Sequence, residues 1–456
     1  MRTTDNNGGV ALDKLKKDED ETYSLEDLQR IANTKIKDIK LDEYPNLLVF
    51  PRDWNFHHDD VDSSEIFSLS NDNVLKTGNI MGFVGINDTS LTITSRFATD
   101  EKDSFLHYML QKVFAINVLN LKTSGDRDDI MNWLLFFFPY FLNKALLQGL
   151  YKEYRHNEYN DTNVRGSVDV KRHLRINIPF MGKIAYSTRE YSYNNPVMQA
   201  IRHTIEHIRT HEYGSGLLAG DTDTLMNINQ ITLATPDYNR NDRQKIINVN
   251  KKKPVVHPYF IEYKALQRLC LRILCNEKIS TNNEKEKIHG ILFDGAWLWE
   301  EYLNTILKGL GFKHPKNKTS EHGYPLFIVE ENEKEKLEGR IYPDFIREKD
   351  MLIADAKYKH LEKTSGNNPD YFQLMAYMYR FNSQNGCLIY PHSGEKKVEQ
   401  KHILEGIEKK CYKPGNGEIM LFGLKIPQEK QSFADFKGEM ENSEKELIKE
   451  FTKEMV

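Results

Sequence analysis

The feature that most constrains the fold is a pair of strand-like runs, residues 340–347 and 351–359, separated by the polar corner at residues 348–350. A two-residue turn in this corner predicts a hairpin in which Asp344 faces Asp355. Directly opposed residues of a hairpin have Cβ atoms roughly 5 Å apart. The register therefore predicts two carboxylates side by side on one sheet.

Lys357 belongs to the same patch, because side chains alternate along a strand and Lys357 shares the face of Asp355. Phosphodiester cleavage needs a water molecule, a metal ion that polarises the phosphate and a group that takes the proton. Asp344 and Asp355 are candidate Mg²⁺ ligands, with the Ala356 carbonyl as a third and Mn²⁺ as a substitute ion. Lys357 is placed to orient or deprotonate the water, with a pKa lowered by partial desolvation. The alternative is a surface hairpin with a cross-strand ion pair, but facing like charges favour a bound cation.

Glu300 is a further candidate for the metal site. The helix predicted over residues 293–310 places Glu300 on its apolar face, three residues before Leu303. The alternative reading is an acid at the helix edge that pairs with a lysine. Glu301 is expected to face solvent, and Glu330 is a weaker candidate.

Gln373 and Tyr377 are four residues apart on the helix predicted over residues 371–381, so they share a face. An amide and a phenol can hold a phosphate or help to seat Lys357. The alternative is one polar edge of a packed helix.

Basic clusters at residues 171–175, which include Lys171 and Arg172, and at 251–253 are candidate phosphate contacts, although such clusters are commonly solvated. The His-His-Asp-Asp run at residues 57–60 is not expected to converge on a metal ion. The sequence has no G-x-x-x-x-G-K-[ST] phosphate-binding loop, so the chain is not expected to hydrolyse a nucleotide unaided.

A chain of 456 residues is long for a single core and predicts two or three domains. Its net charge of −4 argues against a protein that grips nucleic acid alone. Four cysteines without a C-x-x-C pair, and a polar start without a signal peptide, indicate a cytoplasmic protein. The apolar run at residues 133–142 is too short to span a membrane.

Local patterns divide the chain into regions. Polar composition predicts a disordered tail over residues 1–22 and a loop-rich segment over 211–260. Apolar or alternating runs predict strands at residues 47–50, 82–86 and 90–97. Helical spacing predicts helices at residues 105–114, 129–154, 196–210 (capped by Asn194 or Asn195) and 265–275. A charged stretch at 277–287 is the best internal boundary, and the order of elements after it predicts a mixed sheet flanked by helices.

The hairpin sequences Tyr342-Pro343-Asp344 and Asp355-Ala356-Lys357 resemble the PD-(D/E)xK nuclease signature. Their surroundings are similar to McrC, the endonuclease subunit of McrBC-type modification-dependent restriction systems. The similar segments are residues 147–154, 165–169, 189–196, 293–302, 373–377 and 388–391. The resemblance covers roughly residues 80–425 and is strongest after residue 290.

The resemblance implies an α/β and α+β multidomain chain, with a partner-binding region at residues 23–284 and a PD-(D/E)xK endonuclease domain at 285–456. The first region would include a helical connector at about 258–284. Carried over by position, the catalytic set is Asp344, Asp355, Lys357, Glu300 and Gln373.

The partner implied by the resemblance is an McrB-like AAA+ GTPase hexamer, which binds the GTP and recognises double-stranded DNA containing modified cytosine. This chain would stimulate the GTPase and cut the DNA. One departure is the sequence Thr94-Ser95-Arg96-Phe97 where the family is expected to have a Pro-Lys pair; Arg96 would keep the positive charge, and the partner contact at this strand stays open. The alternatives are an inactive nuclease-fold adaptor that regulates the GTPase ring, and a repair nuclease that cuts without GTP or a partner.

Overall fold

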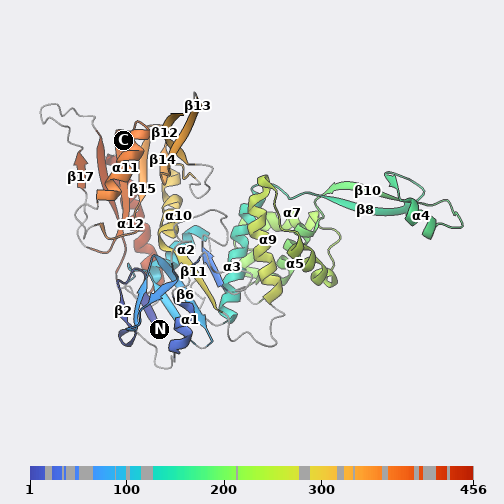
Figure 1. Cartoon of the computed structure of the whole chain (residues 1–456), viewed down its shortest axis with the longest axis horizontal. Helices are drawn as coiled ribbons and strands as arrows, with labels where there is room; N and C mark the ends of the chain where they lie inside the picture. The colour runs from blue at the N-terminus through green and yellow to red at the C-terminus, as the bar shows by residue number, and fades with distance from the viewer. Residues whose placement is uncertain are drawn as a thin grey trace. The chain divides into compact units, whose positions relative to one another are not determined.

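The computed structural model describes residues 1–15, 23–32, 35–36, 47–50, 65–87, 89–98, 103–114, 127–211, 214–276, 288–315, 323–331, 334–361, 368–394, 400–403, 417–428 and 432–454 (Figure 1). The chain folds as two compact units. Unit 1 contains Met1–Ile130 and Asn283–Val456, and unit 2 contains Met131–Asn282. The division differs from the expected one, because residues at both ends of the chain fold together and unit 2 is inserted between them.

A five-stranded sheet in unit 1 joins the start of the chain to residues that follow unit 2. Its order is β1 (Arg2–Thr4), β7 (Thr89–Thr94), β6 (Ile80–Ile86), β11 (His289–Asp294) and β3 (Leu47–Phe50). Strand β11 runs antiparallel to β6 and parallel to β3. At Gly82 the φ angle is +123°, and a Cβ atom would lie 2.0 Å from the Ile291 carbonyl oxygen, so only glycine allows this approach. The three predicted strands are confirmed with shifted ends.

The prediction of a disordered tail over residues 1–22 is wrong for residues 1–15. Strand β1 pairs in parallel with β7, and β2 (Val10–Ala11) pairs with β5 (Val74–Thr77), which also pairs with β4 (Phe67–Leu69). The side chains of Met1, Leu12 and Leu15 are buried in the same core as α1 (Leu25–Ile31). These apolar residues are too widely spaced to give a periodic signal. Residues 16–22 lie outside the described residues.

A second sheet in unit 1 carries the predicted hairpin. Its order is β14 (Phe345–Arg347), β15 (Leu352–Ala356), β16 (Asn385–His392), β18 (Glu418–Lys425) and β17 (Gln400–Ile403). The three central strands are parallel, and the two outer strands are antiparallel to their neighbours. The predicted mixed sheet is thus confirmed.

Helices cover this sheet. α10 (Gly295–Leu307) contacts β15, α11 (Asn368–Arg380) contacts β15 and β16, and α12 (Phe433–Glu454) contacts β18 (Figure 1). α11 packs on a core to which each of the three central strands contributes an apolar side chain, namely Ile353, Leu388 and Ile419. α10 also packs on α2 (Ser104–Phe114).

Two predicted boundaries need correction here. Residues 340–347 are not one strand, because β13 (Lys334–Ile341) pairs only with β12 (Tyr324–Glu331) in a separate ribbon, and β14 begins at Phe345. Pro343 lies between β13 and β14 and has no backbone N–H that could donate a hydrogen bond to a neighbouring strand. Residue 293 belongs to β11, and α10 begins after Asp294, whose carboxylate accepts a hydrogen bond from the Ala296 N–H at 2.8 Å.

Unit 2 is built on helices. α5 (Pro196–Arg209) contacts α6 (Gly214–Leu218), α7 (Thr222–Ala234), α8 (Arg243–Lys252) and α9 (Ile261–Asn276). Asn195 caps α5 through a hydrogen bond from the Met198 N–H, as one of the two predicted caps. The prediction of a loop-rich segment at 211–260 is wrong, because α7 and α8 lie in this range. Both helices carry many polar residues on their exposed faces. The predicted helix at 129–154 ends early, since α3 (Arg127–Leu146) stops before Gly149, whose φ is +81°.

A long ribbon leaves the helices of unit 2. β8 (Glu153–Asp161) pairs with β10 (Ile184–Ser192), and β10 also pairs with β9 (Ser167–Val168). α4 (Val170–Ile176) lies at the far end of this ribbon from α5, and none of its residues is buried (Figure 1). Eight large apolar side chains between residues 164 and 181, 38–82% exposed, form what we call the apolar tip: Val164, Val168, Val170, Leu174, Ile176, Ile178, Phe180 and Met181.

His203 is a buried histidine on α5, only 3% exposed. Its ring packs on Tyr238 with centroids 4.7 Å apart, and within the described residues its Nε2 has no hydrogen-bond partner. Burial, and then the positive charge of Arg243, lowers the pKa of His203 to about 4. As the pH falls, His203 is protonated in the unfolded chain before it is protonated in the folded chain. The stability that the neutral His203 allows is therefore complete above about pH 6.5 and is lost as the pH falls toward 4.

We expect this one group to lower the free energy of unfolding by about 2 kcal/mol between pH 7 and pH 5. The substitution His203→Gln should remove that part of the pH dependence, as measured by urea unfolding at both pH values. His156→Gln, at an exposed position on β8, is the matched control and should leave the pH dependence unchanged. A His203 variant that keeps the full difference seen in the wild type would contradict the assignment.

Candidate functional site

The structure brings Asp344 and Asp355 together. β14 and β15 pair with the predicted register, Phe345 opposite Ala354 and Arg347 opposite Leu352. Asp344 precedes β14 by one residue, and its Oδ2 accepts a hydrogen bond from the Ala356 N–H at 2.8 Å. A main-chain bond to the neighbouring strand thus fixes Asp344 beside Asp355.

The carboxyl groups of Asp344 and Asp355 are buried close to each other. Burial, then the negative charges of Glu300 and Asp355, raises the pKa of Asp344 well above its usual range, although the Ala356 N–H and Lys357 oppose the rise. Burial also raises the pKa of Asp355, which is 2% exposed, against the opposing effect of Lys357 and of a hydrogen bond from Asp344. Proton binding is therefore favoured at this pair, and more at Asp344 than at Asp355.

Lys357 lies in the site as predicted, but its protonation differs from the expectation. Its Nζ is 2.6 Å from Asp355 Oδ2 and donates a hydrogen bond to Gln373 Oε1 at 2.8 Å. Burial lowers the pKa of Lys357, but the charge of Asp355 and the bond to it outweigh burial, and the pKa is raised. The prediction that the pKa of Lys357 is lowered is wrong, because Asp355 is a close ion-pair partner of the lysine as well as a candidate metal ligand. Lys357 is held as a cation.

Gln373 and Tyr377 share a face of α11, as predicted, and form a chain that ends at Lys357. Gln373 Nε2 donates to Tyr377 Oη at 2.7 Å, and Tyr377 Oη donates to the Tyr342 carbonyl at 3.1 Å. Gln373 therefore holds the ammonium group of Lys357 in position. Tyr377 is buried and its hydroxyl bonds inside the protein, so it orients Gln373 and does not face nucleic acid as expected.

Glu300 approaches the site from α10, as predicted. It is half-buried, and its charge is the second largest influence on the pKa of Asp344. Its neighbour Glu301 is also half-buried and lies 4.0 Å from His314 Nε2, while His314 Nδ1 is 2.7 Å from the Asp344 carbonyl oxygen. The side chain of Glu330 lies outside the described residues.

Two residues of the site were missed from the sequence. Asp370 lies in the first turn of α11, with Oδ2 2.5 Å from Lys359 Nζ and Oδ1 3.8 Å from Lys357 Nζ. Its position three residues before Gln373 places both on one helical face, a signal that the sequence did offer. His314 could not be found in this way, because it reaches Asp344 only through the bridge between Lys313 and Ile346.

The oxygen donors fit a divalent cation of the Mg²⁺ class. Asp344, Asp355 and the Ala356 carbonyl are hard oxygen ligands, and Mg²⁺ needs only one or two carboxylates because it keeps several waters. Among the described residues, no three His, Cys, Asp or Glu side chains group closely enough to hold an ion by themselves. Burial and the mutual repulsion of the acids raise the pKa of Asp344, and a bound cation would relieve that repulsion.

The other predicted contacts lie in unit 2 or outside the described residues. Arg172 Nη2 donates to the carbonyl oxygens of Tyr159 and Tyr186 at 2.8 and 2.7 Å, and its guanidinium pairs with Glu158, so it holds α4 on the ribbon rather than facing a phosphate. Lys171 is exposed at the start of α4. Residues 57–60 lie outside the described residues. No helix in the described ranges is both long and apolar enough to cross a membrane.

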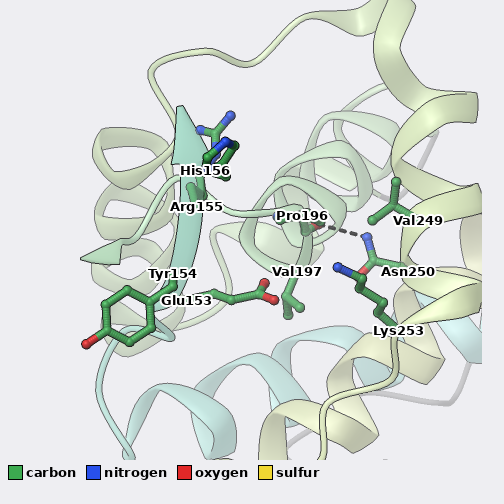
Figure 2. A pocket seen from close by; sticks show the side chains of 9 residues that line it. All are labelled: Glu153, Tyr154, Arg155, His156, Pro196, Val197, Val249, Asn250 and Lys253. Carbon is green, nitrogen blue, oxygen red and sulfur yellow. Dashed lines mark hydrogen bonds between the residues drawn. The ribbon is translucent and has the colours of Figure 1, made fainter. Parts of the chain in front are cut away.

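A pocket at the root of the ribbon is lined by β8, the start of α5 and the end of α8, and it contains none of the acids of the candidate site (Figure 2). Asn250 Nδ2 donates to the Pro196 carbonyl at 2.8 Å across this pocket. Arg155 Nη1 donates to the Asn194 carbonyl at 2.6 Å. The first bond joins α8 to the start of α5, and the second ties the ribbon to the residue two before α5.

Comparison with known proteins places the chain in a family. No curated protein matches it. One similar structure is a refined half-complex from a tetradecameric assembly of Thermococcus gammatolerans McrB AAA+ hexamers with bound McrC, at 14% identity and a TM-score of 0.36, covering 84% of this chain and 87% of that chain. Another is the cryo-EM structure of the Thermococcus gammatolerans McrBC complex, at 13% identity and a TM-score of 0.30, covering 68% of this chain and 87% of that chain. A family model described as McrBC 5-methylcytosine restriction system component matches residues 75–391, which is more than half of the sequence and includes Asp344, Asp355 and Lys357. The chain belongs to this McrBC family.

Proposed function

We propose that this chain is the Mg²⁺-dependent endonuclease subunit of a GTP-dependent, methylcytosine-directed restriction complex. In this proposal the β14–β15–β16–β18–β17 sheet is a PD-(D/E)xK nuclease core. The observation that carries the proposal is the backbone bond from Ala356 that holds Asp344 beside Asp355, with Lys357 2.6 Å from Asp355. An acid pair held in this way is costly without a cation, which argues for a site rather than for a structural ion pair.

Each residue of the proposed site has a separate task. Asp344, Asp355 and the Ala356 carbonyl would hold Mg²⁺, with Mn²⁺ as a substitute. The bound ion would polarise the scissile phosphate and acidify a water molecule. Lys357 already carries its proton, so it would orient a phosphate oxygen or the water, with Gln373 fixing its position. Proton acceptance is then assigned to the carboxylate of Glu300 rather than to the lysine.

The partner in this proposal is an McrB-like AAA+ GTPase hexamer, which binds GTP and reads the modified cytosine in double-stranded DNA. This chain would stimulate its GTP hydrolysis. We assign the docking surface to the apolar tip of unit 2, because exposed apolar area of this kind on a ribbon is typical of a surface that another protein covers. The bond from Arg155 to the Asn194 carbonyl would help to hold the root of the ribbon against the start of α5.

Cleavage of methylated plasmid DNA by the full chain tests the function. We expect cutting only when Mg²⁺, GTP and the AAA+ partner are all present, and no cutting of unmethylated plasmid. Cutting without GTP and partner would indicate a repair nuclease instead. Strong GTPase stimulation with no cutting in Mg²⁺ or Mn²⁺ would indicate an inactive adaptor and would overturn the proposal.

A further inference from the structure

Tyr358 lies between two lysines of the site and points away from them. β15 ends at Ala356, and beyond it the backbone is tied to the sheet by the bond from the Lys357 N–H to the Ile389 carbonyl at 2.9 Å. Lys357 and Lys359 both reach Asp370, so the intervening side chain of Tyr358 must leave on the other side of the strand. It is 5% exposed, although it follows the last residue of the strand.

Tyr358 is buried against the turn at residues 95–97, which follows β7 in the first sheet. Its Oη lies 2.7 Å from Ser95 Oγ and 3.2 Å from Met81 Sδ. Ser95 Oγ also accepts a hydrogen bond from the Phe97 N–H at 3.1 Å. All three hydrogen bonds can form together if the Ser95 hydroxyl donates to Tyr358 Oη and the Tyr358 hydroxyl donates to the Met81 sulfur. The Phe97 ring packs edge-on, with centroids 5.2 Å apart.

Arg96 closes the other side of the ring. Its guanidinium carbon lies 4.8 Å from the centre of the Tyr358 ring. The guanidinium is fixed by Asp5, whose Oδ2 accepts bonds from Nε at 2.9 Å and from Nη2 at 2.5 Å, and by a bond to Asn79. Asp5 is fully buried, and the Arg96 side chain is 10% exposed. The positive charge of Arg96 is therefore paired inside unit 1.

The same ring touches the helix that carries Glu300. A Cβ atom on Gly295, the first residue of α10, would lie 2.8 Å from Tyr358 Cε1. The Gly295 N–H donates to the Asn79 carbonyl at 2.6 Å. One tyrosine therefore contacts the first sheet, the start of α10 and the end of the strand that bears Lys357.

We propose that Tyr358 and the 95–97 turn are positioning residues for Lys357, so that the β1–β7–β6–β11–β3 sheet fixes the ammonium of the nuclease site. The inference rests on the proposed function for its effect on cutting. The Lys357 N–H bonds to the Ile389 carbonyl, and just beyond this bond the chain leaves the sheet at Tyr358. The buried ring of Tyr358 therefore holds the backbone on the side of Lys357 that has left the sheet.

Two variants remove the same contact from opposite sides. Tyr358→Phe and Ser95→Ala are each expected to lower the single-turnover cleavage rate of the full complex by about ten-fold, at unchanged half-saturating DNA concentration. The double variant should be no slower than either single variant, because both lose one shared interaction. Tyr108→Phe is the matched control: it removes a buried tyrosine hydroxyl that donates to Glu444 at 2.8 Å in the same unit, and it should leave the cleavage rate unchanged.

Hydrogen exchange of the full chain gives a readout that does not depend on cutting. Amides of residues 357–361 should exchange at least about ten-fold faster in Tyr358→Phe and Ser95→Ala, but not in Tyr108→Phe. Unchanged exchange overturns the inference whether or not the wild type cuts DNA. Faster exchange with wild-type cleavage in an active complex also overturns it, because Lys357 would then not depend on this anchor. A wild type that fails to cut refutes the proposed function alone, and the exchange result still decides the anchor.

Discussion

Replacing Asp355 with asparagine is expected to lower the rate of DNA cleavage by at least about 1,000-fold. The asparagine keeps the shape of the side chain and removes one of the two charges that would hold the cation. Lys357→Ala is expected to be similarly inactive, because it leaves Asp355 without the ammonium 2.6 Å away and removes the cation that faces the phosphate. Both variants should still stimulate the GTPase of the partner within about two-fold, since the apolar tip belongs to unit 2 and is untouched.

The control for this result is Glu348→Gln in the same hairpin. Glu348 pairs with Lys313 at 2.6 Å, and both side chains are well exposed, so the pair contributes little. We expect cleavage by Glu348→Gln to equal that of the wild type. Loss of cutting in Glu348→Gln would mean that any disturbance of the hairpin inactivates the chain. The inactivity of Asp355→Asn could then not be assigned to the lost charge of Asp355.

Metal binding gives the second readout. In the wild type, 10 mM Mg²⁺ should raise the free energy of unfolding over that in EDTA by about 1.4 kcal/mol, if the dissociation constant is near 1 mM. In Asp355→Asn the rise should disappear, whereas in Glu348→Gln it should remain. An Asp355→Asn protein that cuts DNA, or that keeps the Mg²⁺-dependent rise, would refute the assignment of the site.

Much of this site was predictable because its geometry is local. The pairing of Asp344 with Asp355 follows from the turn and from strand alternation, and the shared face of Gln373 and Tyr377 follows from helical spacing. The protonation of Lys357 was not predictable in the same way, since it depends on the balance of burial and charge in three dimensions. His314 reaches Asp344 from a segment with no pattern of its own.

The rest of the fold was harder to predict because it depends on long-range pairing. β11 finds its partners, β3 and β6, across the whole of unit 2. The start of the chain looked like a polar tail, yet Asp5 is buried because Arg96 compensates its charge. Such contacts add no periodicity to either segment, so composition alone favoured disorder.

Replacing three side chains of the apolar tip with serine should separate the subunit from its partner. Leu174, Phe180 and Met181 are 56%, 62% and 82% exposed, so the substitutions should change the free energy of unfolding by less than about 1 kcal/mol. If the partner covers them, each contributes about 1–2 kcal/mol to binding, and the triple variant should bind at least about 100-fold more weakly. GTPase stimulation and GTP-dependent cleavage should fall together at fixed protein concentration.

The matched control uses three apolar side chains of similar exposure on α7 of the same unit. Leu225, Met226 and Leu233 are 44%, 55% and 82% exposed, and their replacement by serine should leave GTPase stimulation unchanged. The tip variant should also keep the Mg²⁺-dependent rise in stability, because unit 1 is unaltered. The tip variant should thus lose GTPase stimulation and keep the Mg²⁺-dependent rise, whereas Asp355→Asn should keep the stimulation and lose the rise. Full stimulation by the tip variant would show that the partner docks on another surface of the chain. The assignment of the docking surface to the apolar tip would then be wrong.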